Sequence, residues 1–282
     1  MQVSWIAHGA VRVLALLALL PLSSGAQEAS ALPEGNAYVR SVLRDASPQD
    51  AAINDYAYDV LESRETLNRD GSVRSRETKR FEVYFVKTRP VRRLVAKNGA
   101  PLSPRDQAQE DRRAETQARA IAEGRTVSER PGVRLGSLVD RFDFRTVARE
   151  AREGRATLVF EFSPRPDATK PSNDEAADRV TRILSGRLYI DETERRVARL
   201  EAWNTPGRDA KVSTGVKLGA LSTITDFTRV AERVWLPRSV LTEATARAFF
   251  FRTVRVRNEV AYSNYRRFEV NTEERPAPQP FF

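Results

Sequence analysis

The chain has 282 residues and a formal net charge of +9, because 47 lysines and arginines outnumber 38 aspartates and glutamates. It contains no cysteine, one methionine and one histidine, His8. Beyond residue 8 the sequence therefore lacks every imidazole and thiol side chain. This excludes Ser-His-Asp and Cys-His nucleophile relays, thiol redox centres and the usual nitrogen and sulfur ligands of zinc. The functions that remain are catalysis by carboxylates and binding without catalysis.

The excess of positive charge indicates a protein that anionic surfaces attract. Most of the cations are arginines interleaved with acidic residues along the whole chain, as in Arg64-Glu65 and Arg76-Glu77. Such mixing is typical of a solvated surface and not of a nucleic acid-binding stripe. We expect no nucleic acid partner, whereas an anionic membrane surface stays open as a partner.

Residues 1–26 have the pattern of a secretory signal peptide. Arg12 supplies the positive flank, residues 13–20 are apolar, and residues 24–26 are small residues that a signal peptidase accepts. The apolar run is shorter than the ~18 residues that a membrane-spanning helix needs. We therefore expect cleavage near Ala26 and export to the periplasm.

Three segments carry the signals of a helix. The first follows Asn36 as its cap, ends before Pro48, and has on one face Val39, Val42, Leu43 and Ala46. The second starts at Ser103-Pro104 and runs to about Glu123, as an insertion over 103–123. Its apolar positions are nearly all alanine, which indicates either a solvent-exposed helix or a mobile helix that covers another part of the protein. The third, an insertion over 173–184, follows a capping box at 172–175 and ends before Gly186.

Most of the remaining chain alternates apolar and polar residues, which predicts strands. Asp70-Gly71 and Asn98-Gly99 predict tight turns, and Arg89-Pro90 predicts a break between two strands. The predicted strands are 56–60, 81–85, 91–96, 142–147, 156–162, 187–190, 197–203, 218–227, 234–241, 248–256 and 262–270. This order predicts a mainly β fold with some α. We expect an open antiparallel β-barrel, in effect a half-barrel, whose strongly curved sheet is covered on its concave side by helices. We expect a single domain over 27–275 and a Pro-rich tail over 276–282.

Three segments resemble a known family. They are 93–99 (Arg-Leu-Val-Ala-Lys-Asn-Gly) with Pro-Leu-Ser at 101–103, 186–191 (Gly-Arg-Leu-Tyr-Ile-Asp) with 197–200, and 234–237 (Val-Trp-Leu-Pro). Together they are similar to the outer-membrane lipoprotein-sorting proteins, relatives of the periplasmic lipoprotein carrier and its receptor, with a LolA/LolB-like fold. The resemblance covers most of residues 56–270. The resemblance implies an open barrel that holds acyl chains, and the family has no catalytic residue that could be assigned to this chain. In the carrier an arginine helps to hold a helical lid shut, and Arg93 is the candidate for that residue here.

An apolar hollow in a curved sheet would be lined by the aromatic and aliphatic residues of alternating strands. The candidate lining residues are Phe81, Val83, Phe85, Leu158, Phe160, Phe162, Trp203, Trp235, Phe249 and Phe251. Burial of each acyl methylene against such a surface stabilises a complex by ~0.8 kcal/mol. We expect a monomeric periplasmic protein, without metal or cofactor and without enzyme activity, that binds lipid or the acyl chains of a lipoprotein.

Three other functions stay open. The scaffold also fits an envelope-stress sensor or scaffold that binds an envelope protein through its outer surface. A carboxylate-based hydrolase would use Asp140 with Asp143, or the acidic cluster of Asp191, Glu192 and Glu194. An outer-membrane barrel would need a paired final strand, which the prolines at 276, 278 and 280 oppose.

Overall fold

The computed structural model describes residues 31–45, 51–125, 139–165, 179–205, 207–248 and 252–268. By internal contacts the chain divides into two units, Met1–Ala31 and Leu32–Phe282. Every helix and strand described below belongs to the second unit. Within the described ranges, no helix combines the length and the apolar character needed to cross a membrane.

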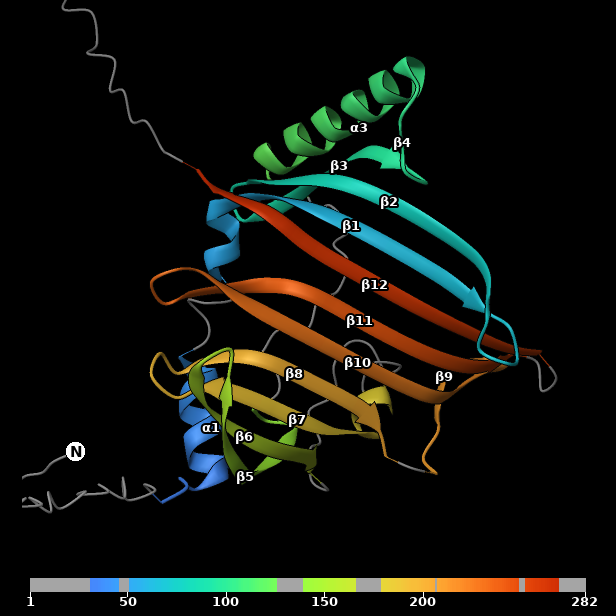
Figure 1. Ribbon diagram of the computed structural model, residues 1–282. Coiled ribbons are helices and arrows are strands. Elements are labelled where there is room, and N and C mark those ends of the chain that lie inside the picture. The colour runs from blue at the N-terminus through green and yellow to red at the C-terminus, as the bar shows by residue number, and fades with distance from the viewer. Residues whose placement is uncertain are drawn as a thin grey trace, which may run out of the picture. The chain divides into compact units, whose positions relative to one another are not determined.

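In the part of the chain that the structure describes, twelve antiparallel strands form one sheet with the order β4-β3-β2-β1-β12-β11-β10-β8-β7-β6-β5, and β9 pairs with β10 beside this path. The end strands β4 and β5 do not pair with each other among the described residues, so the sheet is open (Figure 1). The predicted mainly β, open and curved antiparallel sheet is confirmed. The strands are β1 (Tyr56–Leu67), β2 (Val73–Val86), β3 (Arg89–Lys97), β4 (Ala100–Pro101), β5 (Phe142–Arg152), β6 (Arg155–Pro164), β7 (Leu184–Asp191), β8 (Arg196–Asn204), β9 (Ala210–Ser213), β10 (Val216–Ala231), β11 (Val234–Ala248) and β12 (Arg252–Arg267).

The first helix, α1 (Gly35–Arg44), starts slightly earlier than predicted. Its cap is Glu34, whose carboxylate accepts hydrogen bonds from the N–H groups of Asn36 and Ala37. Asn36 was predicted as the cap, and this is wrong, because its side-chain oxygen accepts instead from the N–H of Phe144 in β5 at 2.9 Å. Asn36 therefore joins the helix to the sheet. The predicted helical residue Ala46 lies outside the described residues.

The second helix, α3 (Pro104–Ala122), has the predicted position and signals. The Ser103 hydroxyl accepts a hydrogen bond from the N–H of Asp106 at 3.2 Å, and proline occupies the first turn. Gly124, with φ of +77°, follows the helix end. A short 3₁₀ helix, η1 (Ile53–Asp55), precedes β1.

Helices α1 and α3 pack on opposite faces of the sheet. Val83 of β2 packs with Tyr58 and Val60, whereas its neighbour Tyr84 packs with Val91 beneath α3. Residues that pair in neighbouring strands lie on the same face of the sheet. The pairs from Val83 through β1, β12, β11 and β10 lead to Leu200 of β8, so Val83 and Leu200 share a face. Leu200 packs in the core beneath α1. We call the two faces the α1 face and the α3 face. Figure 1 shows α3 along β3 at one end of the sheet and α1 beside β5 and β6 at the other.

The main hydrophobic core lies between α1 and strands β5 to β8. Val39, Val42 and Leu43 of the helix are at most 1% exposed. They pack against apolar side chains that alternate along the strands, including Phe142, Phe144, Leu158, Phe160, Phe162, Leu188, Ile190 and Val197. The predicted apolar stripe of the helix is therefore the stripe that docks.

Two predicted strand boundaries are wrong. The turn between β2 and β3 lies at residues 87–88, where Lys87 has φ of 57°, so Arg89-Pro90 belongs to β3. Pro90 fits there because no described strand pairs with β3 on its other side at this position, and its missing N–H leaves no ladder bond unmade. The predicted strands 248–256 and 262–270 are one strand, β12, and residue 248 ends β11.

The predicted helix over 173–184 lies mostly outside the described residues, and its predicted end at Gly186 is wrong. Strand β7 already begins at Leu184. A Cβ at Gly186 would lie 1.9 Å from the Glu201 carbonyl oxygen and 2.5 Å from Cζ of Phe162. Glycine at this position leaves space for the Phe162 ring and does not terminate a helix.

Candidate binding site

The predicted lining residues fall into four groups. Leu158, Phe160 and Phe162 are at most 4% exposed and belong to the core beneath α1. Phe81, Val83 and Phe85 lie on the same face of the sheet at its other end. The two tryptophans lie elsewhere, as described below. Residues 249 and 251, the predicted Phe249 and Phe251, lie outside the described residues.

An aromatic cluster covers the α1 face of β1, β2 and β12. Its buried members are Tyr58, Val60 and Val83, and partly buried residues pack around them: Ile53, Phe81, Phe85, Val260, Tyr262 and Tyr265. We call these nine residues the aromatic patch. Of them, η1 contributes Ile53 and the three strands contribute the rest. The sequence prediction included only the β2 members, although Tyr58 and Tyr262 alternate on their strands in the same way.

The rings of the aromatic patch contact one another around Tyr58. The ring centroid of Tyr58 lies 5.3 Å from that of Tyr265, 5.9 Å from that of Tyr262 and 6.3 Å from that of Phe85, all with tilted planes. These separations are within the range of favourable aromatic pairs. The patch is therefore a connected apolar surface whose outer members keep some of their area exposed.

The tyrosine hydroxyls of the patch stay neutral. Burial raises the pKa of Tyr58, of Tyr262 and of Tyr265, because the phenolate would lose its hydration. The Tyr265 hydroxyl donates a hydrogen bond to the carbonyl of Pro237 at 2.5 Å. The patch thus presents hydrocarbon and neutral phenol groups, and no buried charge, to whatever contacts it.

The cation of Arg92 borders the aromatic patch. Arg92 of β3 pairs in register with Val83 and so lies on the α1 face. Its guanidinium carbon is 4.1 Å from the ring centroid of Phe81, within the range of a cation–π contact. Nη2 of Arg92 lies 2.5 Å from Oε1 of Glu62, and both side chains keep about a quarter of their area exposed, 26% and 25%. The border therefore combines a positive group with an accessible carboxylate.

Arg93, the candidate lid-holding residue, connects α3 to the sheet. It lies on the α3 face, where Nη2 is 2.5 Å from Oε2 of Glu82 and Nη1 is 3.0 Å from Oδ1 of Asp111. Hydrogen bonding to Glu82, opposed by burial and supplemented by Asp111, raises the pKa of Arg93. Glu110 of the helix also accepts a hydrogen bond from the N–H of Leu94 at 2.9 Å. The helix that Arg93 binds thus covers the face opposite to the aromatic patch.

The tryptophans do not join the aromatic patch. Trp203 follows Ala202, which packs beneath α1, so the alternation of β8 places Trp203 on the other face. Trp235 lines a pocket of mainly charged residues beside the place where β8 and β10 stop pairing, beyond Arg199 and Asp226. The lining residues are Arg152, Glu153, Arg155, Thr157, Asp191, Ala198, Asp226, Phe227, Trp235 and Arg238.

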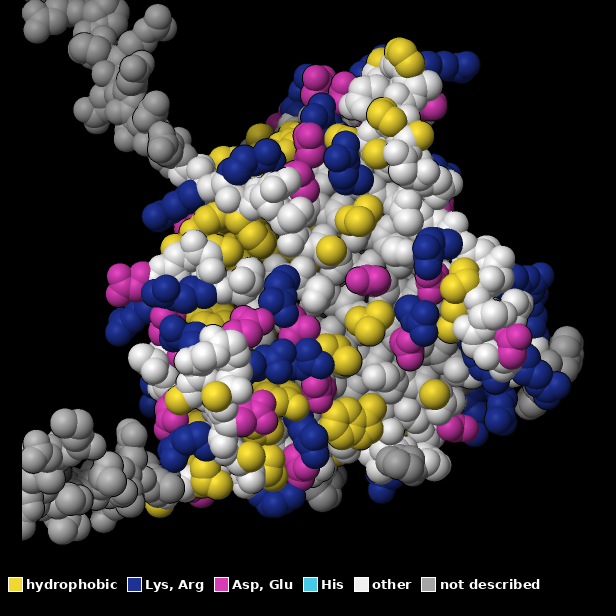
Figure 2. Space-filling view, in the orientation of Figure 1, with side chains coloured by type: hydrophobic (Ala, Val, Ile, Leu, Met, Phe, Trp, Pro, Cys, Tyr) yellow, Lys and Arg dark blue, Asp and Glu magenta, His cyan; other side chains and the backbone are white. Residues whose placement is uncertain are grey.

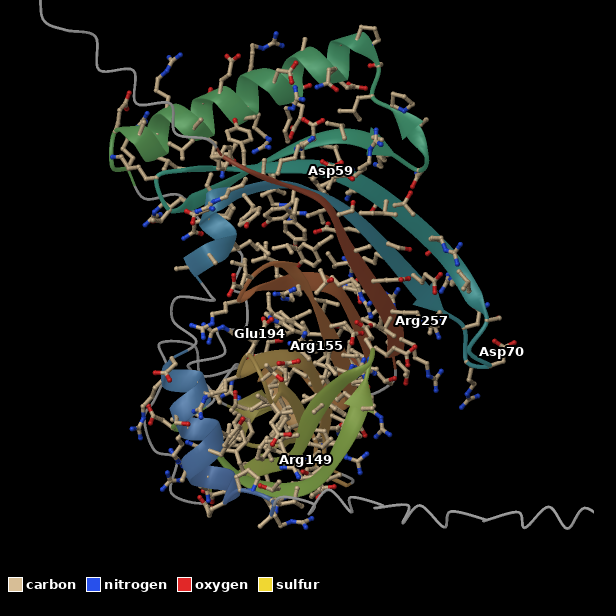
Figure 3. All side chains as sticks on the ribbon, turned by 60° about the vertical axis from the view of Figure 1, so that its left-hand side comes forward. Asp59, Asp70, Arg149, Arg155, Glu194 and Arg257 are labelled. Atoms are coloured by element: carbon tan, nitrogen blue, oxygen red, sulfur yellow. The ribbon has the colours of Figure 1, made fainter. Side chains whose placement is uncertain are left out.

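Arg155 organises one side of this charged pocket. Its Nε and Nη2 lie 2.5 Å and 3.0 Å from the two carboxylate oxygens of Asp191, and Nη2 lies 3.3 Å from Glu194 (Figure 3). The Trp235 indole N–H donates to Glu194 at 2.7 Å. Burial raises the pKa of Asp191, but the hydrogen bonds and charge of Arg155 and the N–H of Glu194 lower it more, so the net pKa lies below its usual value.

This geometry bears on the acidic clusters that the sequence singles out. A glycosidase of the paired-carboxylate type needs one carboxyl with a raised pKa as proton donor, and Asp191 has the opposite shift. Glu192 is bound by Arg149 at 2.8 and 2.9 Å. Asp143 is 50% exposed and lies 3.8 Å from Arg40. Among the described residues, no group of three or more side chains is arranged to hold a metal ion.

Comparison with solved structures finds several similar chains, including the following two. The chain is similar to a domain from Vibrio parahaemolyticus described as an outer membrane lipoprotein-sorting protein domain, with a TM-score of 0.36 and 11% identity, over 84% of this chain and 95% of that one. It is also similar to a DUF1329 family protein from Desulfovibrio piger, with a TM-score of 0.32 and 12% identity, over 83% and 94% of the two chains. No protein-family model matches the sequence. No curated protein matches it either.

Proposed function

We propose that the protein is an exported binding protein that holds an acyl chain of a lipid or lipoprotein against the aromatic patch. The observation that carries the proposal is a connected apolar surface on β1, β2 and β12 whose outer members are only partly buried. The function rests on this geometry and on the chemistry of the side chains, and not on the distant structural likenesses.

The aromatic patch suits a hydrocarbon ligand. Its rings offer apolar area, and its phenol groups are neutral because burial raises their pKa. Burying about ten methylenes at ~0.8 kcal/mol each would contribute about 8 kcal/mol before the cost of ordering the chain. Binding of this kind needs no acid, base or metal, in agreement with a chain that lacks imidazole and thiol groups beyond residue 8.

Arg92 sets the orientation of the proposed ligand on the aromatic patch. A carboxylate or phosphate head group at the border of the patch would meet the guanidinium that lies over Phe81 and would compete with Glu62 for it. The acyl chain would then extend from Arg92 over Phe81 and Val60 towards Tyr262, three residues that the strand register places opposite one another. Export to the periplasm follows from the signal pattern of residues 1–26 and belongs to the same proposal.

Replacement of two rings tests the site. The double variant Phe81→Ser/Phe85→Ser should bind a fluorescent fatty acid roughly 30-fold more weakly, because two partly buried rings contribute about 2 kcal/mol of apolar contact. The measurement is a fluorescence titration of protein whose circular dichroism spectrum matches the unchanged protein.

The matched control is Leu61→Ser. Leu61 is 48% exposed and, as the neighbour of Val60 in β1, lies on the α3 face. This control should bind like the unchanged protein. Unaltered affinity in the folded double variant, or an equal loss in the control, would remove the proposed site.

A further inference from the structure

Three cations stand side by side at one end of the sheet. In the strand register Lys211 of β9 is directly opposite Lys217 of β10, and Lys217 is directly opposite Arg247 of β11. All three side chains are exposed. Neighbouring strands lie about 4.8 Å apart, so the three charges form a short row across the strands.

This row is unfavourable for the fold. Like charges directly opposite in neighbouring strands repel each other and destabilise the sheet. The compensation is one carboxylate: Oδ2 of Asp209 lies 2.8 Å from Nζ of Lys217. Hydrogen bonding from Lys217, together with the charges of Lys217 and Arg247, lowers the pKa of Asp209 although burial opposes this. Within the described residues, Asp209 forms an ion pair with Lys217 alone, and no ion pair joins Lys211 or Arg247 to a carboxylate.

Strand β12 extends the positive surface. Arg255 is opposite Thr245 on one side and Leu67 on the other, so neither residue directly opposite it is acidic. Two residues further along the same strand, Arg257 pairs with both Glu243 at 2.6 Å and Glu65 at 3.2 Å. The register places Arg255 on the same face as Arg247. Figure 2 shows basic side chains gathered at the right-hand end of the view, where Figure 1 places β9 and the ends of β1 and β12.

We propose that Lys211, Lys217, Arg247 and Arg255, the basic surface, dock the protein on an anionic phospholipid bilayer. The four cations are spread over four strands, so they match an array of head-group phosphates better than one enclosed anion. Such a bilayer would neutralise the repulsion that the fold otherwise carries. The surface lies apart from the aromatic patch: Leu67, opposite Arg255, is seven residues or roughly 23 Å along β1 from Val60.

The test compares binding of the purified protein to vesicles of phosphatidylglycerol mixed with phosphatidylcholine and to vesicles of phosphatidylcholine alone. The variant is Lys211→Gln/Lys217→Gln/Arg247→Gln. Each Lys or Arg near an anionic surface raises the affinity roughly fivefold, so the triple variant should bind the anionic vesicles roughly a hundredfold more weakly. Binding of the unchanged protein should weaken as salt is added. Uptake of a fluorescent fatty acid in detergent-free solution should stay unchanged in the variant.

The matched control removes the same charge from α3 through Arg105→Gln/Arg112→Gln/Arg119→Gln. These arginines are exposed, and no ion pair joins them to other described residues. The control should keep most of its vesicle binding. The triple variant of the basic surface should melt at the same temperature or higher, because repulsion is relieved. Retained vesicle affinity in that variant, an equal loss in the control, or equally tight binding to phosphatidylcholine alone would overturn the proposal.

Discussion

At the scale of single residues, arginines determine the state of the acidic side chains. Asp191 is 1% exposed, and it stays ionised because Arg155 donates two hydrogen bonds to it. Glu65 is 5% exposed and lies between Arg76 and Arg257; the hydrogen bond from Arg76 is the largest cause of its lowered pKa. Asp191, Glu192 and Glu194, an acidic cluster that the sequence marks as a candidate for hydrolysis, thus pair with arginines.

The low pKa of Asp191 makes stability depend on pH. A carboxyl with a lower pKa in the folded state than in the unfolded state stabilises the protein above its unfolded pKa of about 3.9, and this contribution is lost as the pH falls through the folded pKa. Urea unfolding at a series of pH values should show stability falling below about pH 4. The variant Asp191→Asn should be less stable at neutral pH and less sensitive to acid.

The control for that series is Asp143→Asn, which removes a carboxylate that is 50% exposed. It should leave both the stability and its acid dependence nearly as they are. An Asp191→Asn variant with the same stability as the unchanged protein at neutral pH would contradict the assigned role of Arg155 and Asp191.

At the scale of elements, local signals predict α3 and the tight turns well. Ser103 and Pro104 begin the helix as expected, and Asn98 and Gly99 take φ values of 51° and 80°, which suit a tight hairpin turn. The boundaries of β3 and β12 were predicted wrongly because proline at an outer strand and a polar stretch within a long strand resemble turns. Which residues end a strand depends on the neighbouring strand.

The cap of α3 can be measured directly. The Ser103 hydroxyl accepts from the N–H of Asp106, and this bond satisfies one of the free donors at the helix start. Ser103→Ala should therefore lower the free energy of unfolding by about 1 kcal/mol in a urea titration. Ser103→Asn should restore most of it, because asparagine caps as well as serine and puts no second negative charge beside Asp106. Equal stability of the alanine and asparagine variants would show that the cap contributes nothing.

At the scale of the whole sheet, two groups of strands meet at a short ladder. β10 pairs with β11 from Val216 to Ala231, but with β8 only from Ser222 to Asp226. Asp226, at the end of the short ladder, accepts hydrogen bonds from Arg152 at 3.0 Å and from Arg199 at 2.9 and 3.0 Å. One carboxylate therefore joins β5, β8 and β10 where the backbone pairing stops.

Removal of this carboxylate should loosen the ladder. In Asp226→Ala, two arginines lose their shared partner, and we expect a loss of about 1–3 kcal/mol in stability. Amide hydrogen exchange measured by mass spectrometry should become faster in the peptides that cover 199–203 and 222–226. Asp143→Ala, which lies on β5 away from this ladder, is the control. Unchanged exchange in those peptides would show that backbone pairing alone holds the two groups together.

The sequence by itself determined the chemistry that the chain lacks, the predominance of strands and the apolar faces of most of them, because composition and periodicity are local properties. The tertiary structure alone decided which aromatic side chains fill the core beneath α1 and which remain in the aromatic patch. It also decided that α3 packs on the other face, and that Glu65 meets Arg257, 192 residues away. The physical reason is that alternation defines two faces of a strand, but only the register with distant strands decides which helix, ring or charge each face contacts.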